Sequence, residues 1–306
     1  PLLCLYLLVP FILNVNINLQ EDYADKALLS RVHHKEKSEL IQNTLDSNNE
    51  LYRFDDAFTL YGVNRVEDLR QWKTTQYSSN SNLFYRDFYY NIMKQPMKSG
   101  NHVMIPSVSN PYFNGFMGIR YLYDYGKNKE TEYGYKKIAK KEDGFIEENK
   151  EVLPIAYVSY DMLSKEQFEN LSYPYSIEAL YQNTIVEEAI ANKKLSLSVQ
   201  KVKPQFDIVD KTETLNITKE HNGVRINNKK NGKMKLRLKK PLEKNQFFII
   251  RFDVEDIAFE NKKHTVISIN GIMNRINSTS DMYRSGKADF EYVLSSNKEL
   301  KDITFS

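Results

Sequence analysis

Apolar and polar positions follow three different rhythms along this 306-residue chain. Residues 1–13 are continuously apolar, the segments 38–46 and 83–93 repeat apolar residues at near-helical spacing, and the last third alternates apolar with polar residues. A repeat of three to four residues indicates one buried helix face, and a repeat of two indicates a strand with one buried face. The pattern therefore predicts helices early in the chain and strands late in it.

Residues 116–160 predict an antiparallel meander. Its first strand is the aromatic run "FMGIRYLYDYG" at 116–126, and "YKKIAKK" and "GFIEENK" form a hairpin across the turn at 142–144. Asp-Gly between two alternating segments is a strong hairpin signal. We expect "LPIAYVS" at 153–159 to close the meander as its last strand.

Two helices are expected after the meander. The first covers 164–171 with Ser164 as its N-cap, because a serine hydroxyl accepts hydrogen bonds from the free N–H groups of a first helical turn. The second lies within "SIEALYQNTIV" at 176–186. We place a domain boundary near 190–195, at "ANKK", where the rhythm changes.

From residue 194 onward the alternation predicts an antiparallel β-sandwich of jelly-roll type, whose C-terminal end we expect to be incomplete. Four segments each place apolar residues on one face, and these residues are Leu195, Leu197 and Val199; Met234, Leu236 and Leu238; Phe248, Ile250, Phe252 and Val254; and Ile267 and Ile269. The predicted fold class is therefore α+β, with an N-terminal α/β unit over 20–193 and a sandwich over 194–306.

The net charge of +3 conceals a difference between the two predicted units. Residues 1–193 carry a balance of −5, and residues 194–306 carry a balance of +8. Such an asymmetry suggests that the two units face different surroundings. The single cysteine, Cys4, excludes an internal disulfide and any metal site that needs several cysteines.

The apolar start "PLLCLYLLVPFIL" is shorter than the ~20 residues that span a bilayer. It lacks the basic region and the cleavage site of a signal peptide. One interpretation is the outer end of a transmembrane helix that leaves the membrane by residue 19, and the alternative is a buried core segment.

An aromatic stretch at 72–90 is the first candidate binding surface. Aromatic faces with flanking polar groups suit sugar rings. The candidate substrate-binding residues are Trp72, Tyr77, Tyr85, Arg86 and Tyr89. The alternative is that these residues are core, since they recur at helical spacing.

A row of cations is the second candidate. Within "KMKLRLK" the alternation puts four of them on one strand face, about 6–7 Å apart, and they are Lys233, Lys235, Arg237 and Lys239. Such a row can bind a polyanion or an anionic membrane surface. The alternative is a charged outer face that keeps a sheet soluble and protects its edge. Nucleic acid is a poor partner, because no aromatic residue interleaves with the row to stack bases.

The remaining candidates carry little chemistry. Asp55 and Asp56 are adjacent, so on a strand they point to opposite faces, and we interpret them as a solvated turn rather than a metal site. His33 and His34 diverge on a helix and are expected to be exposed. No nucleophile, phosphate-loop or zinc motif occurs. The sequence therefore predicts no catalytic residue, no metal and no cofactor.

Several of these strings together resemble one family. The strand "MGIRYLYDYG", the hairpin ending in "GFIEENKEVLPIAYVS", the helical segment and the sandwich resemble the extracytoplasmic region of YfhO-family bacterial membrane proteins. In that family an "lGvkYil" strand precedes a hairpin whose last strand reads like "lPrayfv". "ELYRF" and "QYSSNSNLFYRDFY" are similar to its "yRv" and "YsS" stretches. The resemblance covers most of residues 1–200.

The resemblance implies a polytopic protein of the GT-C glycosyltransferase type. Such a protein moves a sugar from a lipid-phosphate carrier onto cell-wall polymers of Gram-positive bacteria, such as lipoteichoic acid. The catalytic carboxylate of GT-C enzymes lies in an early extracytoplasmic loop that is absent here, so no acid of this chain is assigned that role. The implied partners are the membrane, reached through the N-terminal helix, and an anionic cell-wall polymer or lipid-linked sugar.

Three functional hypotheses follow. The first is an extracytoplasmic domain of a membrane glycosyltransferase-like protein that binds or positions the acceptor and has no turnover alone. The second is a free-standing carbohydrate-binding or adhesion module of the cell surface. The third is a soluble glycan-active enzyme, which would show a bell-shaped pH–rate profile from two carboxylates.

Overall fold

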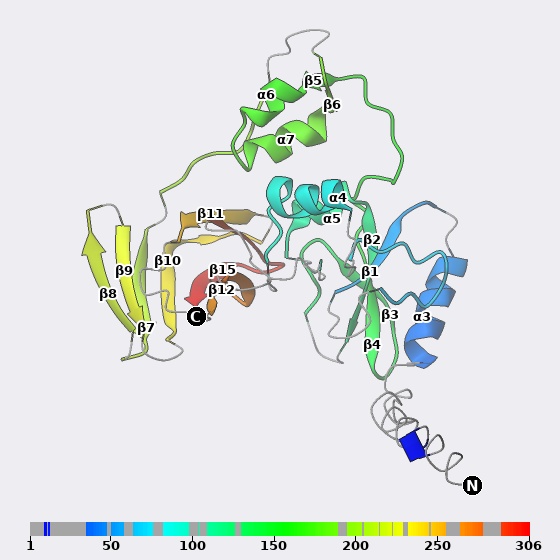
Figure 1. The fold of residues 1–306 in the computed structure, drawn as a ribbon, viewed down its shortest axis with the longest axis horizontal. Helices are drawn as coiled ribbons and strands as arrows, with labels where there is room; N and C mark the ends of the chain where they lie inside the picture. The colour runs from blue at the N-terminus through cyan, green and yellow to red at the C-terminus, as the bar shows by residue number, and fades with distance from the viewer. Residues whose placement is uncertain are drawn as a thin grey trace.

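A computed structural model gives the fold of the chain (Figure 1). The structure describes residues 9–10, 12, 35–47, 50–57, 64–75, 82–97, 104, 109–125, 130–188, 195–203, 205–213, 215–221, 223–228, 232–244, 246–254, 264–277 and 289–306. A four-stranded sheet and a sandwich lie side by side, with short helices between them and a small lobe beside these helices (Figure 1). The predicted α+β class, with mostly antiparallel sheets, is confirmed.

The first sheet has the strand order β1-β2-β4-β3. Its strands are β1 (Arg53–Asp56), β2 (Ile119–Tyr125), β3 (Lys136–Lys140) and β4 (Gly144–Glu148). β1 runs parallel to β2, and the other pairs are antiparallel. The predicted hairpin of β3 and β4 is confirmed.

The aromatic run of β2 is explained by burial on both faces. Tyr121 and Tyr123 pack with α3 (Lys35–Asp46) on one face, and Ile119 and Leu122 enter a different core on the other face. A strand covered on both sides has no polar face, so it reads as a nearly continuous apolar run.

The expected closing strand of the meander, 153–159, is wrong. The N–H of Leu153 donates to Gly115 O and that of Ile155 donates to Leu51 O, at 2.9 and 3.3 Å. β4 already has β2 and β3 as neighbours, so it offers no free edge to a further strand. These two hydrogen bonds lie outside the β4 ladder, and Val158 is exposed.

Short helices connect the two halves of the molecule. They are α4 (Leu83–Asp87), the π-helical turn η1 (Phe88–Ile92) and α5 (Pro111–Phe116). α4 and η1 confirm the helical interpretation of 83–93. The ring of Tyr89 packs edge-on against Phe113 at 5.2 Å between centroids, so this region is held by an aromatic core.

A small lobe follows the first sheet. It contains a parallel pair of strands, β5 (Met162–Ser164) and β6 (Thr184–Val186), and the helices α6 (Lys165–Glu169) and α7 (Tyr175–Gln182). The Ser164 hydroxyl accepts a hydrogen bond from the Gln167 N–H at 3.2 Å. The predicted N-cap is therefore confirmed.

The sandwich has a five-stranded layer of order β13-β12-β15-β10-β7 and a two-stranded layer of β11 and β14. Its strands are β7 (Phe206–Lys211), β10 (Met234–Leu242), β11 (Phe247–Asp253), β12 (His264–Ile269), β13 (Ile272–Asn277), β14 (Asp289–Ser295) and β15 (Leu300–Phe305), and a separate hairpin joins β8 (Leu215–Glu220) to β9 (Gly223–Asn228). The inward faces predicted for β10, β11 and β12 are confirmed.

The strand expected at 195–200 is wrong, although its alternation is real. Leu195, Leu197 and Val199 are half-buried and their neighbours are exposed. The N–H groups of Ser198 and Val199 donate to the Glu178 carboxylate on α7, at 2.6 and 3.2 Å. The Glu178 side chain thus accepts the backbone hydrogen bonds that a neighbouring strand would otherwise have accepted. The boundary expected at 190–195 lies mostly outside the described residues and stays a prediction.

Strands β11 and β14 belong to two cores at once. Phe248, Ile250 and Phe252 pack in the sandwich core, whereas Phe247 and Ile249 pack against the aromatic core of α4 and α5. Phe247 meets Tyr112 edge-on at 4.8 Å between ring centroids. The sandwich and the helical layer therefore share one ribbon of chain.

The N-terminal predictions are only partly within the described residues. Val9, Pro10 and Ile12 are helical, and His33 and His34 lie outside the described residues. Within the described part of the chain, no helix combines the length and the apolarity needed to cross a membrane.

Candidate binding cleft

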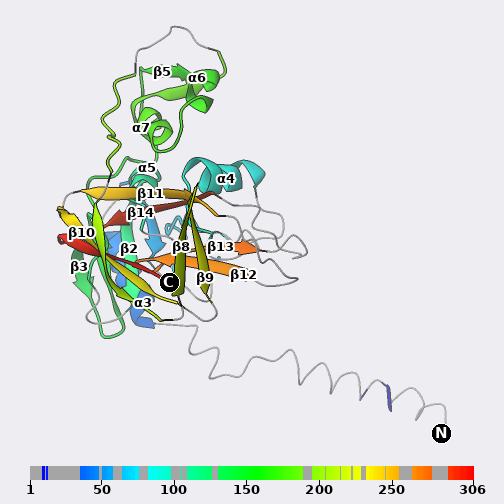
Figure 2. The same cartoon turned by 90° about the vertical axis from the view of Figure 1, so that its left-hand side faces the viewer.

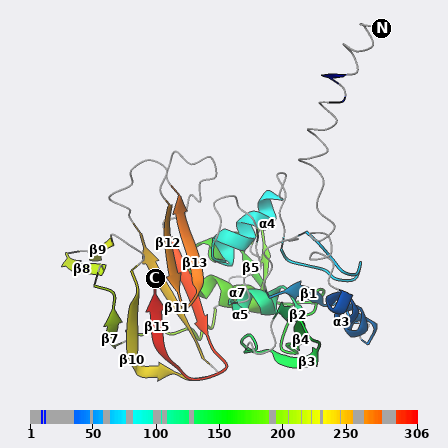
Figure 3. The same cartoon turned by 90° about the horizontal axis from the view of Figure 1, so that it is seen from below.

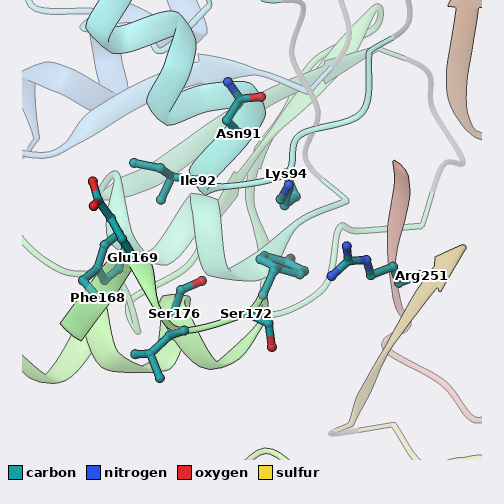
Figure 4. Close-up of a pocket in the computed structure, with 10 residues that line it drawn as sticks. Asn91, Ile92, Lys94, Phe168, Glu169, Ser172, Ser176 and Arg251 are labelled. Atoms are coloured by element: carbon teal, nitrogen blue, oxygen red, sulfur yellow. The ribbon is translucent and has the colours of Figure 1, made fainter. Parts of the chain in front are cut away.

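A cleft of about 300 Å³ lies where the helices, the small lobe and the sandwich meet (Figure 4). Its lining residues come from η1 and the residues that follow it, from α6 and α7, and from β11, and they are Asn91, Ile92, Lys94, Phe168, Glu169, Leu171, Ser172, Tyr173, Ser176 and Arg251. Three parts of the fold that are distant in sequence therefore build one concave surface. Ligand sites favour such junctions.

Two cations on one side of the cleft share a buried carboxylate. Lys94 Nζ and Arg251 Nε each lie 3.7 Å from Oε1 of Glu291, whose side chain is fully buried. Arg251 and Glu291 are direct cross-strand partners on β11 and β14. The Lys94 and Arg251 nitrogens therefore lie no further apart than twice that distance, and the Glu291 carboxylate is the counter-charge that they share.

Local backbone structure places Lys94. The N–H of Met93 donates to Phe88 O across the π-helical turn, at 2.8 Å, and Lys94 then adopts a left-handed φ of 52°. The side-chain amide of Asn110 donates to Met93 O at 2.9 Å, and the N–H of Gln95 donates to Tyr89 O. The chain turns sharply here, which directs the lysine to the cleft. A left-handed lysine is strained, and such strain is found at functional positions.

The opposite side of the cleft is polar and aromatic. Figure 4 shows Phe168 and Glu169 of α6 across from Arg251, with Ser172 and Ser176 between them. Burial raises the pKa of Tyr173, which keeps its hydroxyl protonated. The cleft thus combines two cations, hydroxyl groups, an amide and one acceptor carboxylate.

This set of groups suits an anion that also carries hydroxyl groups. Ammonium and guanidinium groups bind phosphate oxygens through charge-assisted hydrogen bonds, and the arginine fork can do so with two at once. Glu169 and Asn91 can accept hydrogen bonds from sugar hydroxyls. Over the described residues no group of three His, Cys, Asp or Glu could hold a metal ion. A sugar phosphate is the ligand class that fits best.

The predicted aromatic surface is divided by the fold. Trp72 is 42% exposed, Tyr85 and Arg86 are half-buried, and Tyr89 is 1% exposed inside the aromatic core. The Tyr85 hydroxyl donates to Thr74 O at 2.6 Å. Tyr89 therefore offers no surface to a ligand, and Tyr77 lies outside the described residues. Sugar binding by the other three stays a prediction.

The predicted basic row lies along the outer face of β10 and the residue before it, and three of its four cations pair with acids. Arg237 Nε lies 2.9 Å from Oδ1 of Asp302, and Lys235 Nζ lies 2.8 Å from its Oδ2. Lys239 is 3.6 Å from Asp207, and the N–H of Lys233 donates to the Thr212 hydroxyl. β10 lies between β15 and β7, so the row does not protect an edge as the alternative supposed.

The interpretation of Asp55 and Asp56 as a solvated turn is wrong. Both are buried on β1. Asp55 accepts hydrogen bonds from the N–H and the hydroxyl of Thr74, at 2.8 and 2.5 Å. Asp56 pairs with Lys37 of α3 at 2.8 Å and with Lys73 at 2.6 Å. They do point to different partners, as adjacent strand residues should.

Lys94, Arg251 and Glu291 were not among the residues predicted from the sequence. One signal could have found two of them. Arg251 and Glu291 are charged residues flanked on both sides by apolar residues in "FFIIRFDV" and "DFEYVLS", and a charge inside a buried strand requires a partner. Nothing local marks Lys94, because its position depends on the turn after η1.

One of the three comparisons with known proteins identifies a family. A family model described as bacterial membrane protein YfhO matches residues 1–301. Neither a curated protein nor a solved structure matches the chain.

Proposed function

The chain belongs to the YfhO family of bacterial membrane proteins, and we propose that it is the extracytoplasmic part of a membrane glycosyltransferase-like protein. In this proposal the membrane-embedded part transfers a sugar from a lipid-phosphate carrier to an anionic cell-wall polymer of the lipoteichoic acid type. The part described above binds and positions that acceptor, and it has no turnover of its own.

The pair of Lys94 and Arg251 is the observation that carries the proposal. Both line one cleft, and each is 3.7 Å from the same buried oxygen of Glu291. Holding two cations close together is unfavourable unless a counter-charge is present, and the buried carboxylate supplies it from beneath. The side that faces the cleft then presents several N–H donors to a phosphodiester.

The surroundings of the pair match the rest of a polymer unit. The hydroxyls of Ser172 and Ser176 and the amide of Asn91 line the same cleft. Glu169 lies on the side away from Arg251 (Figure 4), so a bound phosphate would not meet its charge first. One sugar or glycerol phosphate unit fits a space of about 300 Å³.

The test is a binding titration with the full 306-residue chain reconstituted in neutral-lipid bilayers. The probe is a short poly(glycerol phosphate), and the variants are Lys94→Gln and Arg251→Gln. Each should weaken binding about tenfold to a hundredfold, since a charge-assisted hydrogen bond contributes about 1.5–3 kcal/mol. The matched control is Lys35→Gln, which removes an exposed cation on α3, and it should leave the affinity unchanged.

A second variant distinguishes the cleft from the basic row. It replaces Lys233, Lys235, Arg237 and Lys239 with Ser. If this variant loses binding while the two cleft variants keep it, the acceptor binds the sandwich and the cleft is not the site. If all variants keep binding, neither the cleft nor the basic row is the acceptor site and the cleft proposal fails. If the unaltered chain does not bind the polymer, acceptor binding by this part of the protein is excluded.

A further inference from the structure

One hydroxyl in the cleft has a proton that no described residue accepts. Tyr173 lines the cleft and is only 8% exposed, and its hydroxyl donates to no group among the described residues. A buried hydroxyl has given up its hydrogen bonds with water, so nearly all such groups in folded proteins are paired. An unpaired donor in the wall of a ligand cleft is explained if the ligand supplies the acceptor.

Packing fixes the ring that carries this hydroxyl. Tyr173 belongs to the aromatic core together with Phe113 and Ile177. α7 begins two residues later, and its Tyr181 packs edge-on against Phe116 of α5, at 5.6 Å between ring centroids. Figure 2 shows α7 directly above α5, and Figure 3 shows the two helices together between the sandwich and the first sheet. The core on both sides therefore restricts where the hydroxyl can point.

Two neighbours place the hydroxyl at the cationic end of the cleft. Burial is the largest effect on the pKa of Tyr173 and raises it, the charge of Glu291 raises it further, and the Asn110 amide acts against both as a donor. The same amide donates to the carbonyl directly before Lys94, at 2.9 Å. Glu291 is the carboxylate that pairs with both Lys94 and Arg251. The Tyr173 hydroxyl therefore lies among the groups that surround the two cations.

We propose that the Tyr173 hydroxyl donates a hydrogen bond to an oxygen of the phosphate that Lys94 and Arg251 bind. This inference rests on the acceptor site proposed above and adds a third, uncharged donor to it. A protonated phenol can donate one hydrogen bond, and a hydrogen bond to an ionised acceptor is about twice as strong as one between neutral groups. Binding of the phosphate thus gives the buried proton its acceptor.

Tyr173→Phe tests the contact, because it removes the hydroxyl and keeps the ring. The full 306-residue chain in neutral-lipid bilayers is titrated with poly(glycerol phosphate) and, separately, with inorganic phosphate. Both affinities should fall about tenfold to a hundredfold, as expected when a hydrogen bond to a charged group is lost. The urea midpoint of the ligand-free variant should not fall, since no protein group loses a hydrogen bond.

Tyr181→Phe is the matched control. The Tyr181 hydroxyl donates to Tyr112 O at 2.6 Å, and its ring packs against the same aromatic core without lining the cleft. This variant should have a lower urea midpoint and unchanged affinity for both probes. The opposite results in the two variants distinguish a hydroxyl that binds the ligand from one that stabilises the fold.

Four results would overturn the proposal. If Tyr173→Phe keeps its affinity while Lys94→Gln weakens binding, the acceptor site stands without this contact. If Tyr173→Phe weakens binding of the polymer but not of inorganic phosphate, the hydroxyl contacts the glycerol unit instead of the phosphate. A urea midpoint lowered as in Tyr181→Phe would assign Tyr173 a structural role. If the unaltered chain binds neither probe, the acceptor site itself fails and this inference fails with it.

Discussion

Adjacent residues on β1 show how the environment decides the chemistry of a carboxylate. Asp56 has Lys37 and Lys73 as ion-pair partners, whereas Asp55 has the hydroxyl and the N–H of Thr74. Burial is the largest effect on Asp55 and raises its pKa, while Lys73 and Thr74 act against it. Folding therefore favours the neutral form of Asp55.

Asp55→Asn should become more stable relative to the parent chain as pH rises from about 4 to 7. An acid whose pKa is raised by folding stabilises the fold below its unfolded pKa, and this stabilisation is lost as pH passes through the folded pKa. Asparagine keeps the acceptor for Thr74 without the charge. Urea unfolding at several pH values measures the difference.

Two controls accompany this measurement. Asp55→Ala leaves the buried Thr74 donors without an acceptor, so it should cost about 1–3 kcal/mol at every pH. Asp302→Asn should give no pH trend above pH 5, because hydrogen bonds from Arg237 and Lys235 lower the pKa of Asp302 to about 2. If the difference in unfolding free energy between Asp55→Asn and the parent chain did not change with pH, the raised pKa of Asp55 would be contradicted.

Glu291→Gln separates the structural role of the cleft from its binding role. Removing the carboxylate leaves Lys94 and Arg251 without their shared counter-charge, so the free energy of unfolding should fall by about 1–3 kcal/mol. The same change should tighten binding of poly(glycerol phosphate) several-fold. Without the carboxylate, Lys94 and Arg251 are no longer partly neutralised, so they attract the phosphate more strongly. Calorimetric titration measures the affinity, with Glu299→Gln on an exposed acid as the control. Weaker binding would contradict an anion site.

At the scale of elements, the correct predictions are those with local causes. The hairpin of β3 and β4 follows from Asp-Gly, and the start of α6 follows from Ser164. The strands at 153–159 and 195–200 failed because distant groups, Gly115 O and the Glu178 carboxylate, take their backbone hydrogen bonds. Alternation reports which side is buried, but it does not report whether a partner strand exists.

The cleft could not be predicted from the sequence, because contacts between residues distant in sequence also build it. Its cations lie 157 positions apart, as Lys94 and Arg251, and Glu291 is on a third segment. Only the tertiary fold brings them together. The family, in contrast, could be identified from the β2 strand and its hairpin, because both are continuous in sequence.

Strand β2 depends on a single glycine, Gly118, which directly precedes it. Its φ is +64°, and an added Cβ would lie 2.5 Å from the Leu153 carbonyl oxygen. Gly118→Ala should therefore cost about 3 kcal/mol or more, through strain and a forced backbone shift. Thermal unfolding measures the loss.

Gly271→Ala is the matched control for this effect. Its φ is +84°, and an added Cβ would meet nothing within 4 Å. The cost should be backbone strain alone, about 1–2 kcal/mol. Equal losses for the two variants would show that the contact with Leu153 does not restrict β2.

On the scale of the whole molecule, the ribbon of β11 and β14 decides whether the two halves are independent. Val293 of β14 is part of the aromatic core, and its neighbours Tyr292 and Leu294 are part of the sandwich core. Because β11 and β14 place side chains in both cores, separating these strands from one core would also expose apolar side chains of the other. The two halves should therefore unfold in one transition.

Phe290→Ala tests this coupling with the natural fluorophore. Phe290 is fully buried in the sandwich core, so its truncation should cost about 3–5 kcal/mol. Trp72 lies in the other half, where its carbonyl accepts a hydrogen bond from Phe54 of β1. If the ribbon couples the halves, Trp72 fluorescence should report a lower urea midpoint, coincident with that of far-UV circular dichroism. Ile41→Ala, on the buried face of α3, should shift both signals in the same way. An unmoved Trp72 transition in Phe290→Ala would mean that the halves fold separately, because the sandwich would then lose its core without disturbing the first sheet.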